Sequence, residues 1–156
     1  MPAKSSHTST PTAATRKAAA DSLIREAGAR LTGPRSAVLT RLLAADHAMT
    51  HQEITDALAA DQAVDRVTVY RVLEWLVEQG LAHRIAGEDR VWRFSVSRGK
   101  VTGGGHDHRH AHFACTQCGQ TFCLGDMPAD VKVKLPAGFR TEAVELTLRG
   151  VCGHCR

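Results

Sequence analysis

The sequence predicts an α+β chain in two parts, and three observations support this fold class. Over residues 18–80, apolar side chains recur three and four positions apart, the spacing of helices that bury one face. After Gly80 the spacing changes to two, which is typical of strands. Two Cys-x-x-Cys pairs follow, a pattern typical of zinc sites. We therefore expect helices closed by a hairpin, followed by a small unit that holds a metal.

Length and composition set the outer limits. The 156 residues suit one medium domain or two small ones. Residues 1–17 are rich in Ser, Thr, Ala and Pro and lack the apolar core of a secretory signal, so we expect a disordered tail. No apolar run approaches the ~18 residues that cross a bilayer. We therefore expect a cytoplasmic protein without membrane contact, in which clustered cysteines stay reduced and bind metal.

The net charge of +4 does not by itself identify a partner. Basic and acidic residues nearly balance outside residues 1–20, so a large basic surface is not expected there. A few well-placed arginines can nevertheless suffice for nucleic-acid binding. Whether the chain binds nucleic acid must therefore be judged from the local sequence patterns.

Three helices are expected before residue 60. A weak one covers residues 18–29 and ends near Gly28. The second begins at Thr32-Gly33-Pro34, because proline fits the first turn of a helix. Thr50 and Glu53 fit a capping box that opens the third. The inward positions of the second and third helices are Val38, Leu39, Leu42, Leu43, Ile54, Ala57 and Leu58.

The fourth helix has the clearest pattern. Asp65 can cap its start, and Gly80 stands where a glycine commonly ends a helix. A hairpin follows, with its turn at Gly87-Glu88-Asp89. The apolar stripe of the helix is Val69, Val72, Leu73, Leu76 and Val77, and the alternating strand residues are Leu81, His83, Ile85, Trp92, Phe94 and Val96.

Helices followed by a hairpin describe a winged helix-turn-helix, which we assign to residues 18–96. In this motif the last helix enters the DNA major groove by its N-terminal half. The residues off its apolar stripe are Arg66, Thr68, Tyr70, Arg71 and Glu74. They are candidates for reading DNA, and the alternative is that they are ordinary surface residues of a helix.

The two cysteine pairs, Cys115–Cys118 and Cys152–Cys155, each lie in a short glycine-containing turn. Four thiolates complete the tetrahedral shell of a structural zinc and leave no open position. The alternative is that one pair is a redox dithiol or simply buried thiols. Between the pairs, GFRTEAVELTLRG predicts a strand, whereas MPADVKVKLP fits a short helix or a strand equally well.

A histidine-rich stretch precedes the first cysteine pair. If it leads into a strand, His108, His110 and His112 project to one face and neighbouring ones can bind one metal. The alternative is a solvated tract that binds metal loosely. Cys123 is left over as either a buried thiol or a ligand. His83 alternates with apolar neighbours, so it faces inward, as a core residue unless a metal cluster lies opposite.

From about Gly28 to Arg156 the chain resembles the ferric uptake regulator family of dimeric metal-sensing repressors. The resemblance rests on GARLTGPRSAVL, RVTVYRVLEWLVEQGL, the H-x-H before CxxCG, and GVCGHC. It implies a winged helix joined through residues 97–109, a hinge, to an α/β dimerisation and metal-binding domain at 110–156. A structural zinc in the two cysteine pairs, and a regulatory metal at the hinge that favours operator binding, are also implied.

The resemblance also implies particular site residues. Tyr70 and Arg71 match the DNA-contacting positions, to which we add Arg66, Thr68 and Arg35. The regulatory ligands map to His83, His110, His112 and Cys123, with His108 as a further candidate. A thiolate at Cys123 is softer than a carboxylate, so the set suits zinc and the closest likeness is to the zinc uptake regulator branch. A third metal site is expected to be absent, because its donor positions hold Arg109, Ala111 and Thr147, and only Asp130 is kept.

The expected function is a zinc-responsive regulator that represses zinc-uptake genes when zinc-loaded. It would bind two zinc ions per subunit and read an inverted repeat in double-stranded DNA as a homodimer. A nickel, iron or peroxide sensor of the same family is the nearest alternative, and a zinc-buffering protein that does not bind DNA comes from another class. An enzyme is not expected, because neither the zinc-hydrolase signature H-E-x-x-H nor the full deaminase signature, H-x-E followed by P-C-x-x-C, occurs.

Overall fold

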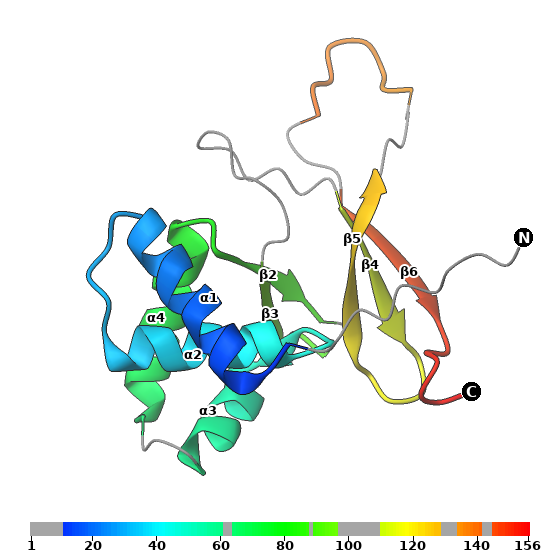
Figure 1. The fold of residues 1–156 in the computed structure, drawn as a ribbon. Helices are drawn as coiled ribbons and strands as arrows, with labels where there is room; N and C mark the ends of the chain where they lie inside the picture. The colour runs from blue at the N-terminus through cyan, green and yellow to red at the C-terminus, as the bar shows by residue number, and fades with distance from the viewer. Residues whose placement is uncertain (1–10, 61–63, 88, 97–109, 129–133, 142–144) are drawn as a thin grey trace, which may run out of the picture.

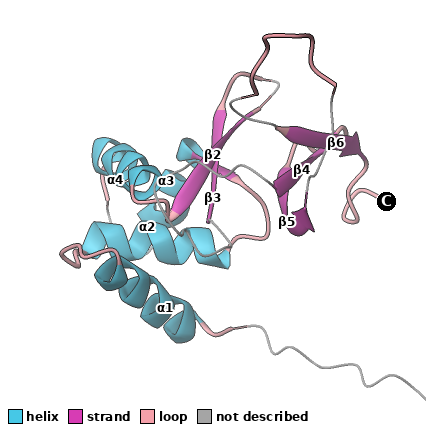
Figure 2. Ribbon diagram, turned by 90° about the horizontal axis from the view of Figure 1, so that it is seen from above, coloured by secondary structure: helices cyan, strands magenta, loops and turns pink. Residues whose placement is uncertain are grey.

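The structure is a computed structural model, and it describes residues 11–60, 64–87, 89–96, 110–128, 134–141 and 145–156. The helices lie on one side of the molecule and the C-terminal three-stranded sheet on the other, with the N-terminal three-stranded sheet between them (Figure 1). Figure 2 shows the same order from above. The elements are α1 (Ala13–Glu26), α2 (Gly33–Ala44), β1 (Met49–Thr50), α3 (His51–Ala59), α4 (Arg66–Glu78), β2 (Ala82–Ala86), β3 (Trp92–Val96), β4 (His110–Cys115), β5 (Thr121–Pro128) and β6 (Leu146–Gly150).

Helix α1 begins earlier than expected. It starts at Ala13, inside residues 1–17, so the predicted disordered tail is wrong for residues 13–17. The hydroxyl of Thr12 accepts a hydrogen bond from the amide of Thr15 at 3.2 Å and caps the helix. The alanine-rich sequence that follows has high helix propensity, and this local preference extends the helix beyond its apolar positions.

The predicted helix ends of α3 and α4 are confirmed. The Thr50 hydroxyl accepts the amide hydrogen of Glu53 at 3.2 Å, and the Glu53 carboxylate accepts the amide hydrogen of Thr50 at 2.7 Å. Asp65 accepts the amide hydrogen of Thr68 at 3.0 Å and caps α4. Gly80 has φ 68°, the left-handed backbone that favours glycine after a helix. Capping hydrogen bonds therefore fix the first residues of α3 and α4, the two helices of the helix-turn-helix.

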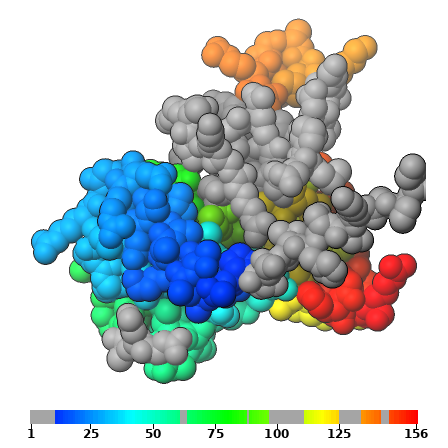
Figure 3. Space-filling model, in the orientation of Figure 1, coloured from blue at the N-terminus to red at the C-terminus, as the bar shows by residue number. Residues whose placement is uncertain are grey.

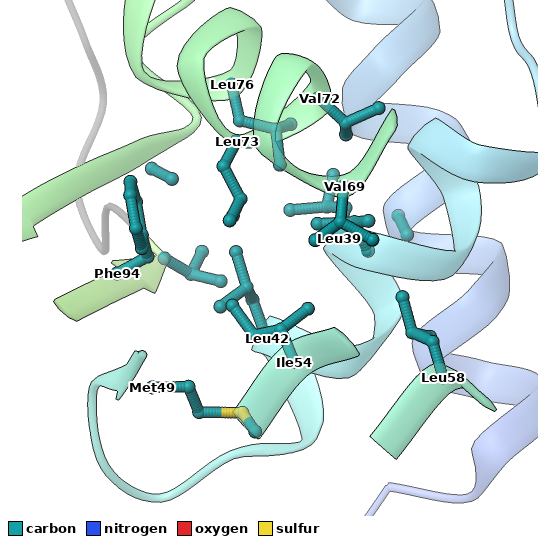
Figure 4. Close-up of a cluster of buried hydrophobic side chains, with 14 of the residues drawn as sticks. Leu39, Leu42, Met49, Ile54, Leu58, Val69, Val72, Leu73, Leu76 and Phe94 are labelled. Atoms are coloured by element: carbon teal, nitrogen blue, oxygen red, sulfur yellow. The ribbon is translucent and has the colours of Figure 1, made fainter. Parts of the chain in front are cut away.

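The helices pack around one apolar core. Leu39 of α2, Ile54 of α3 and Leu73 of α4 have no solvent-exposed surface. Figure 4 shows these side chains converging from their three helices, with Phe94 of β3 closing the core from the sheet. The core therefore fixes the orientation of α4 relative to the other helices. Within the described ranges, none of the helices combines the length and apolar character that crossing a membrane requires.

The first sheet has the antiparallel order β1-β3-β2, and its two faces differ. Residues directly opposite in such a sheet point to the same side. Ala82 pairs with Val96 on the side that packs against the helices, and both residues are buried in the hydrophobic core. His83 pairs with Ser95 on the opposite side and is also buried. The pairing therefore directs His83 away from the helices, towards the second sheet.

The second sheet has the order β5-β4-β6, with β4 in the centre. Strand β4 runs antiparallel to β5 and parallel to β6, so His112 stands opposite Cys123, and Cys115 stands opposite Gly150. The predicted strand over residues 138–150 is present only in its last part, as β6; residues 138–141 form a turn and irregular backbone instead. The ambiguous segment starts as the end of β5, and its residues 129–133, like Val144, lie outside the described residues.

Replacing Leu73 by alanine should lower the free energy of unfolding by about 2–5 kcal/mol, because it leaves a cavity in the core. Val67→Ala is the matched control on the same helix. Val67 is 59% exposed, so this change should alter stability by less than about 0.5 kcal/mol. Urea unfolding of the metal-loaded protein, followed by far-UV circular dichroism, measures both, and equal losses would contradict the packing described.

Candidate metal centres and nucleic-acid interface

Four cysteines converge at the end of the second sheet. Cys115 ends β4 and Cys118 lies in the turn that follows, whereas Cys152 and Cys155 lie in the turn after β6. The four sulfur atoms lie within 4.8 Å of one another. Figure 3 shows the C-terminal residues, in red, beside the yellow turn after β4. The parallel pairing of β4 with β6 brings the two cysteine turns to the same end of the sheet.

The surroundings of these thiols favour a bound cation. The amide of Cys152 donates a hydrogen bond to Sγ of Cys115 at 3.3 Å. This contact and the amide of Cys118 lower the pKa of the Cys115 thiol to about 6. The pKa of Cys155 is raised to about 12, because the neighbouring sulfurs of Cys152 and Cys118 favour its protonated form. Four thiolates at this spacing repel one another, and a divalent soft cation balances their charge, so the cluster can hold zinc.

A second cluster joins the two sheets. It contains His83 of β2, His112 of β4 and Cys123 of β5, whose ligand atoms lie within 4.8 Å of one another. Both imidazoles are buried, and their ring centroids are 5.6 Å apart. His112 and Cys123 are opposite each other in the β4–β5 pair, and His83 reaches them from the other sheet. Three of the five residues predicted as regulatory ligands are therefore brought together.

The other two predicted ligands are not placed by the structure. His110 is the first residue of β4, two positions before His112, and the position of its side chain is not described. His108 lies outside the described residues. The roles of both as ligands stay predictions. Two imidazoles and one thiolate are a donor set that suits a transition-metal ion of the softer kind.

A further contact between the two halves was not predicted. The amide of Ala48, just before β1, donates a hydrogen bond to the carbonyl oxygen of Thr121 at 2.7 Å. Next to it, the ring of His47 lies 6.4 Å from that of Phe122. Sequence reasoning could not find this contact, because a backbone hydrogen bond between distant segments leaves no residue-type signal. It lies two residues from Cys123, so the halves meet both at the cluster and beside it.

The predicted DNA-reading residues lie on the exposed side of α4. Tyr70 is 54% exposed, and Arg66 and Arg71 are exposed beside it. Thr68 is only half-buried, and its hydroxyl donates a hydrogen bond to Asp65 as part of the helix cap. The first half of α4 thus presents basic and aromatic groups while its other face fills the core. This arrangement is the one that helix-turn-helix proteins insert into the major groove.

Arg35 is held by neighbouring groups of the same domain. Its guanidinium lies 4.0 Å from the centre of the Trp75 ring and donates a hydrogen bond to the carbonyl of Arg30 at 2.8 Å. Trp75 lies one turn beyond Arg71 on α4. The side chain of Arg35 therefore joins α2 to α4 at the surface. Its contact with DNA stays a prediction.

Comparisons with known proteins agree with this architecture. The model of the ferric uptake regulator family matches residues 26–149. The transcriptional regulator FurA of Mycobacterium tuberculosis is 30% identical over 136 residues, which cover 85% of this chain and 86% of FurA. The peroxide-responsive repressor PerR of Staphylococcus aureus is 30% identical over 98 residues, 62% of this chain and 60% of PerR.

Solved structures share the fold. A zinc uptake regulator complexed with zinc and DNA has a TM-score of 0.64 at 21% identity, over 94% of this chain and 96% of that one. The ferric uptake regulator of Vibrio cholerae has a TM-score of 0.58 at 22% identity, over 85% and 98%. With the family match over most of its length, the chain belongs to the ferric uptake regulator family of metal-responsive transcriptional regulators.

Proposed function

We propose that this protein is a zinc-responsive repressor that binds DNA as a homodimer and turns off zinc-uptake genes when zinc is plentiful. The observation that carries the proposal is the cluster of His83, His112 and Cys123, which takes one donor from the winged-helix half and two from the other half. A ligand that binds such a cluster favours the closed arrangement of the two halves. The free energy of binding this ligand is thereby linked to the free energy of binding DNA.

The donor types support zinc over harder ions such as manganese. The cluster contains two imidazoles and a thiolate, and among the described residues no carboxylate belongs to it. Nitrogen and sulfur ligands suit zinc, whereas oxygen-rich sets suit manganese and similar harder ions. One of the similar solved structures is described as a zinc uptake regulator with zinc and DNA. We also propose that the four cysteines hold a second, structural zinc, which gives two ions per subunit.

The residues of this chain act on DNA through the position of α4. His83 stands on β2, which follows α4 directly, so ligation shared with His112 and Cys123 holds the DNA-reading half against the second sheet. The hydrogen bond from Ala48 to Thr121 supports the same closed arrangement. We propose residues 97–109, which lie outside the described residues, as the hinge. Tyr70 and Arg71 would then read base edges and phosphates.

A homodimer is proposed because apolar side chains remain exposed on the C-terminal half. Phe139 is 70% exposed, and Leu148 and Val151 are 42% and 46% exposed. Burying them against a second copy gains hydrophobic free energy. A two-fold dimer places two α4 helices on DNA, which predicts an inverted repeat with half-sites about one helical turn, ~10 bp, apart.

His83→Ala should abolish zinc-dependent DNA binding, because it removes the one described ligand of the winged-helix half. The variant should keep one zinc per subunit and an unchanged fold. Binding is measured in zinc-buffered solution by fluorescence anisotropy, with a duplex selected by the wild-type protein from a random pool. His47→Ala, outside the cluster, should keep both ions. If the His83 variant still responds to sub-nanomolar zinc, the assigned site is wrong.

Cys118→Ser should remove the structural zinc and unfold the C-terminal half, because the described residues of that half form little apolar core of their own. A structural zinc contributes on the order of 10–16 kcal/mol in small peptides. Cys123→Ser is the matched control and should lose only the regulatory ion while the fold persists. Zinc content, thermal unfolding and sedimentation measure these outcomes. A normal thermal transition and an intact dimer in Cys118→Ser would contradict the role given to the cluster.

Arg71→Ala should weaken binding to the selected duplex by about 1–3 kcal/mol, roughly 5- to 150-fold, with zinc content unchanged. Arg140→Ala, a change of the same type in the C-terminal half, is the control and should bind normally. Anisotropy titrations at fixed salt compare the two.

The alternative functions give different results in the same assay. A zinc-buffering protein would show no preference for any duplex, and competing titrations with nickel and iron separate the related metal sensors.

A further inference from the structure

His51, the first residue of α3, connects the two helices of the helix-turn-helix. Its Nε2 lies 2.9 Å from the carbonyl oxygen of Arg66, the first residue of α4. A carbonyl oxygen can only accept a hydrogen bond, so Nε2 carries the hydrogen and donates it. The tautomer of the neutral ring is thereby fixed, and the side chain joins the first turns of α3 and α4.

The same ring contacts Tyr70. The two ring centroids are 6.0 Å apart with an interplanar angle of 69°, an edge-to-face arrangement. Tyr70 is 54% exposed, so much of its ring faces solvent. A contact on one side of an exposed ring narrows its range of rotamers. His51 therefore holds both the backbone start of α4 and the side chain one turn further along.

Neither contact is needed to begin a helix. The Thr50–Glu53 capping box already satisfies the first amides of α3, and Asp65 caps α4. The contacts of His51 instead fix α3 relative to α4. Holding a contact residue in its bound conformation before binding reduces the entropy lost on association. A surface residue that contacts a DNA-reading tyrosine can lower the entropy cost of DNA binding in this way.

We infer that His51 is a positioning residue for DNA recognition, which holds Tyr70 and the first turn of α4 in the conformation that reads the duplex. The inference rests on the proposed function, because it assigns a role within the same DNA interface. In this inference His51 acts through Tyr70 and the start of α4, and not through a contact of its own with a phosphate.

The test is a double-mutant cycle on the zinc-loaded, full-length protein with the selected duplex. His51→Ala should weaken binding about five- to tenfold, in line with the loss of one hydrogen bond and one ring contact. In the Tyr70→Ala background the same change should weaken binding by a smaller factor, about two- to threefold, because the contact with Tyr70 is gone and only the bond to the first turn of α4 remains. Equal losses in both backgrounds would overturn the inference.

A second measurement excludes a direct phosphate contact. The slope of log Kd against log salt should be the same for wild type and His51→Ala, and a fall of about one in that slope would overturn the inference. Gln52→Ala is the matched control in the same turn. Its amide bonds only Asp56 among the described residues, so the change should leave affinity within about twofold.

The failure of the two proposals can be told apart. If wild-type protein shows no zinc-dependent binding to any duplex, the proposed function fails and this inference fails with it. If wild type binds normally and the cycle is additive, only the role of His51 fails. Zinc content and the thermal transition of each variant, measured alongside, show that the compared proteins are folded at the temperature of the titration.

Discussion

The structure depends on the pairing of β4 with its two neighbours. Antiparallel pairing with β5 sets His112 opposite Cys123, and parallel pairing with β6 brings the turn after Cys115 to the C-terminal turn of Cys152. Side chains in a strand alternate between faces, so a shift of one residue in the β4–β5 register would separate His112 from Cys123. A shift in the β4–β6 register would instead displace the two cysteine turns from each other. One central strand thus places a structural cluster at its end and a second cluster in its middle.

The winged-helix half meets that strand through the free face of its own sheet. The helices cover one face of the sheet β1-β3-β2, and Phe94 on that face packs into their core. Successive residues of a strand point to opposite faces, so His83 points to the other face, towards the second sheet. The same geometry brings Ala48 to Thr121. A metal-binding cluster formed across such a boundary responds to closure of the two halves. This dependence is the physical basis of the regulation that we propose.

The surface that would read DNA is rigid for independent reasons. The apolar stripe of α4 is buried with Leu73 at its centre, caps fix both helix starts, and His51 bonds one helix to the other. Precise recognition requires this order, because each free rotamer that is fixed on binding costs affinity. In the function that we propose, the cluster between the sheets and the reading helix therefore serve separate tasks. The cluster of His83, His112 and Cys123 sets how the halves are arranged, and the helix core sets what the protein presents to DNA.

The sequence alone determined the features that depend on near neighbours. Capping by Thr50 and Asp65, the glycine at 80, the buried stripe of α4 and the pairing of cysteines within each turn all follow from spacings of a few residues. The sequence pattern predicts a later start for α1 than the structure has, because its first alanines favour a helix but show no apolar periodicity. Tertiary structure alone decided that His83 meets His112 and Cys123, that Ala48 bonds Thr121, and that His51 bonds Arg66. These contacts join segments far apart in the chain, and the packing of sheets and helices fixes them, which no local pattern encodes.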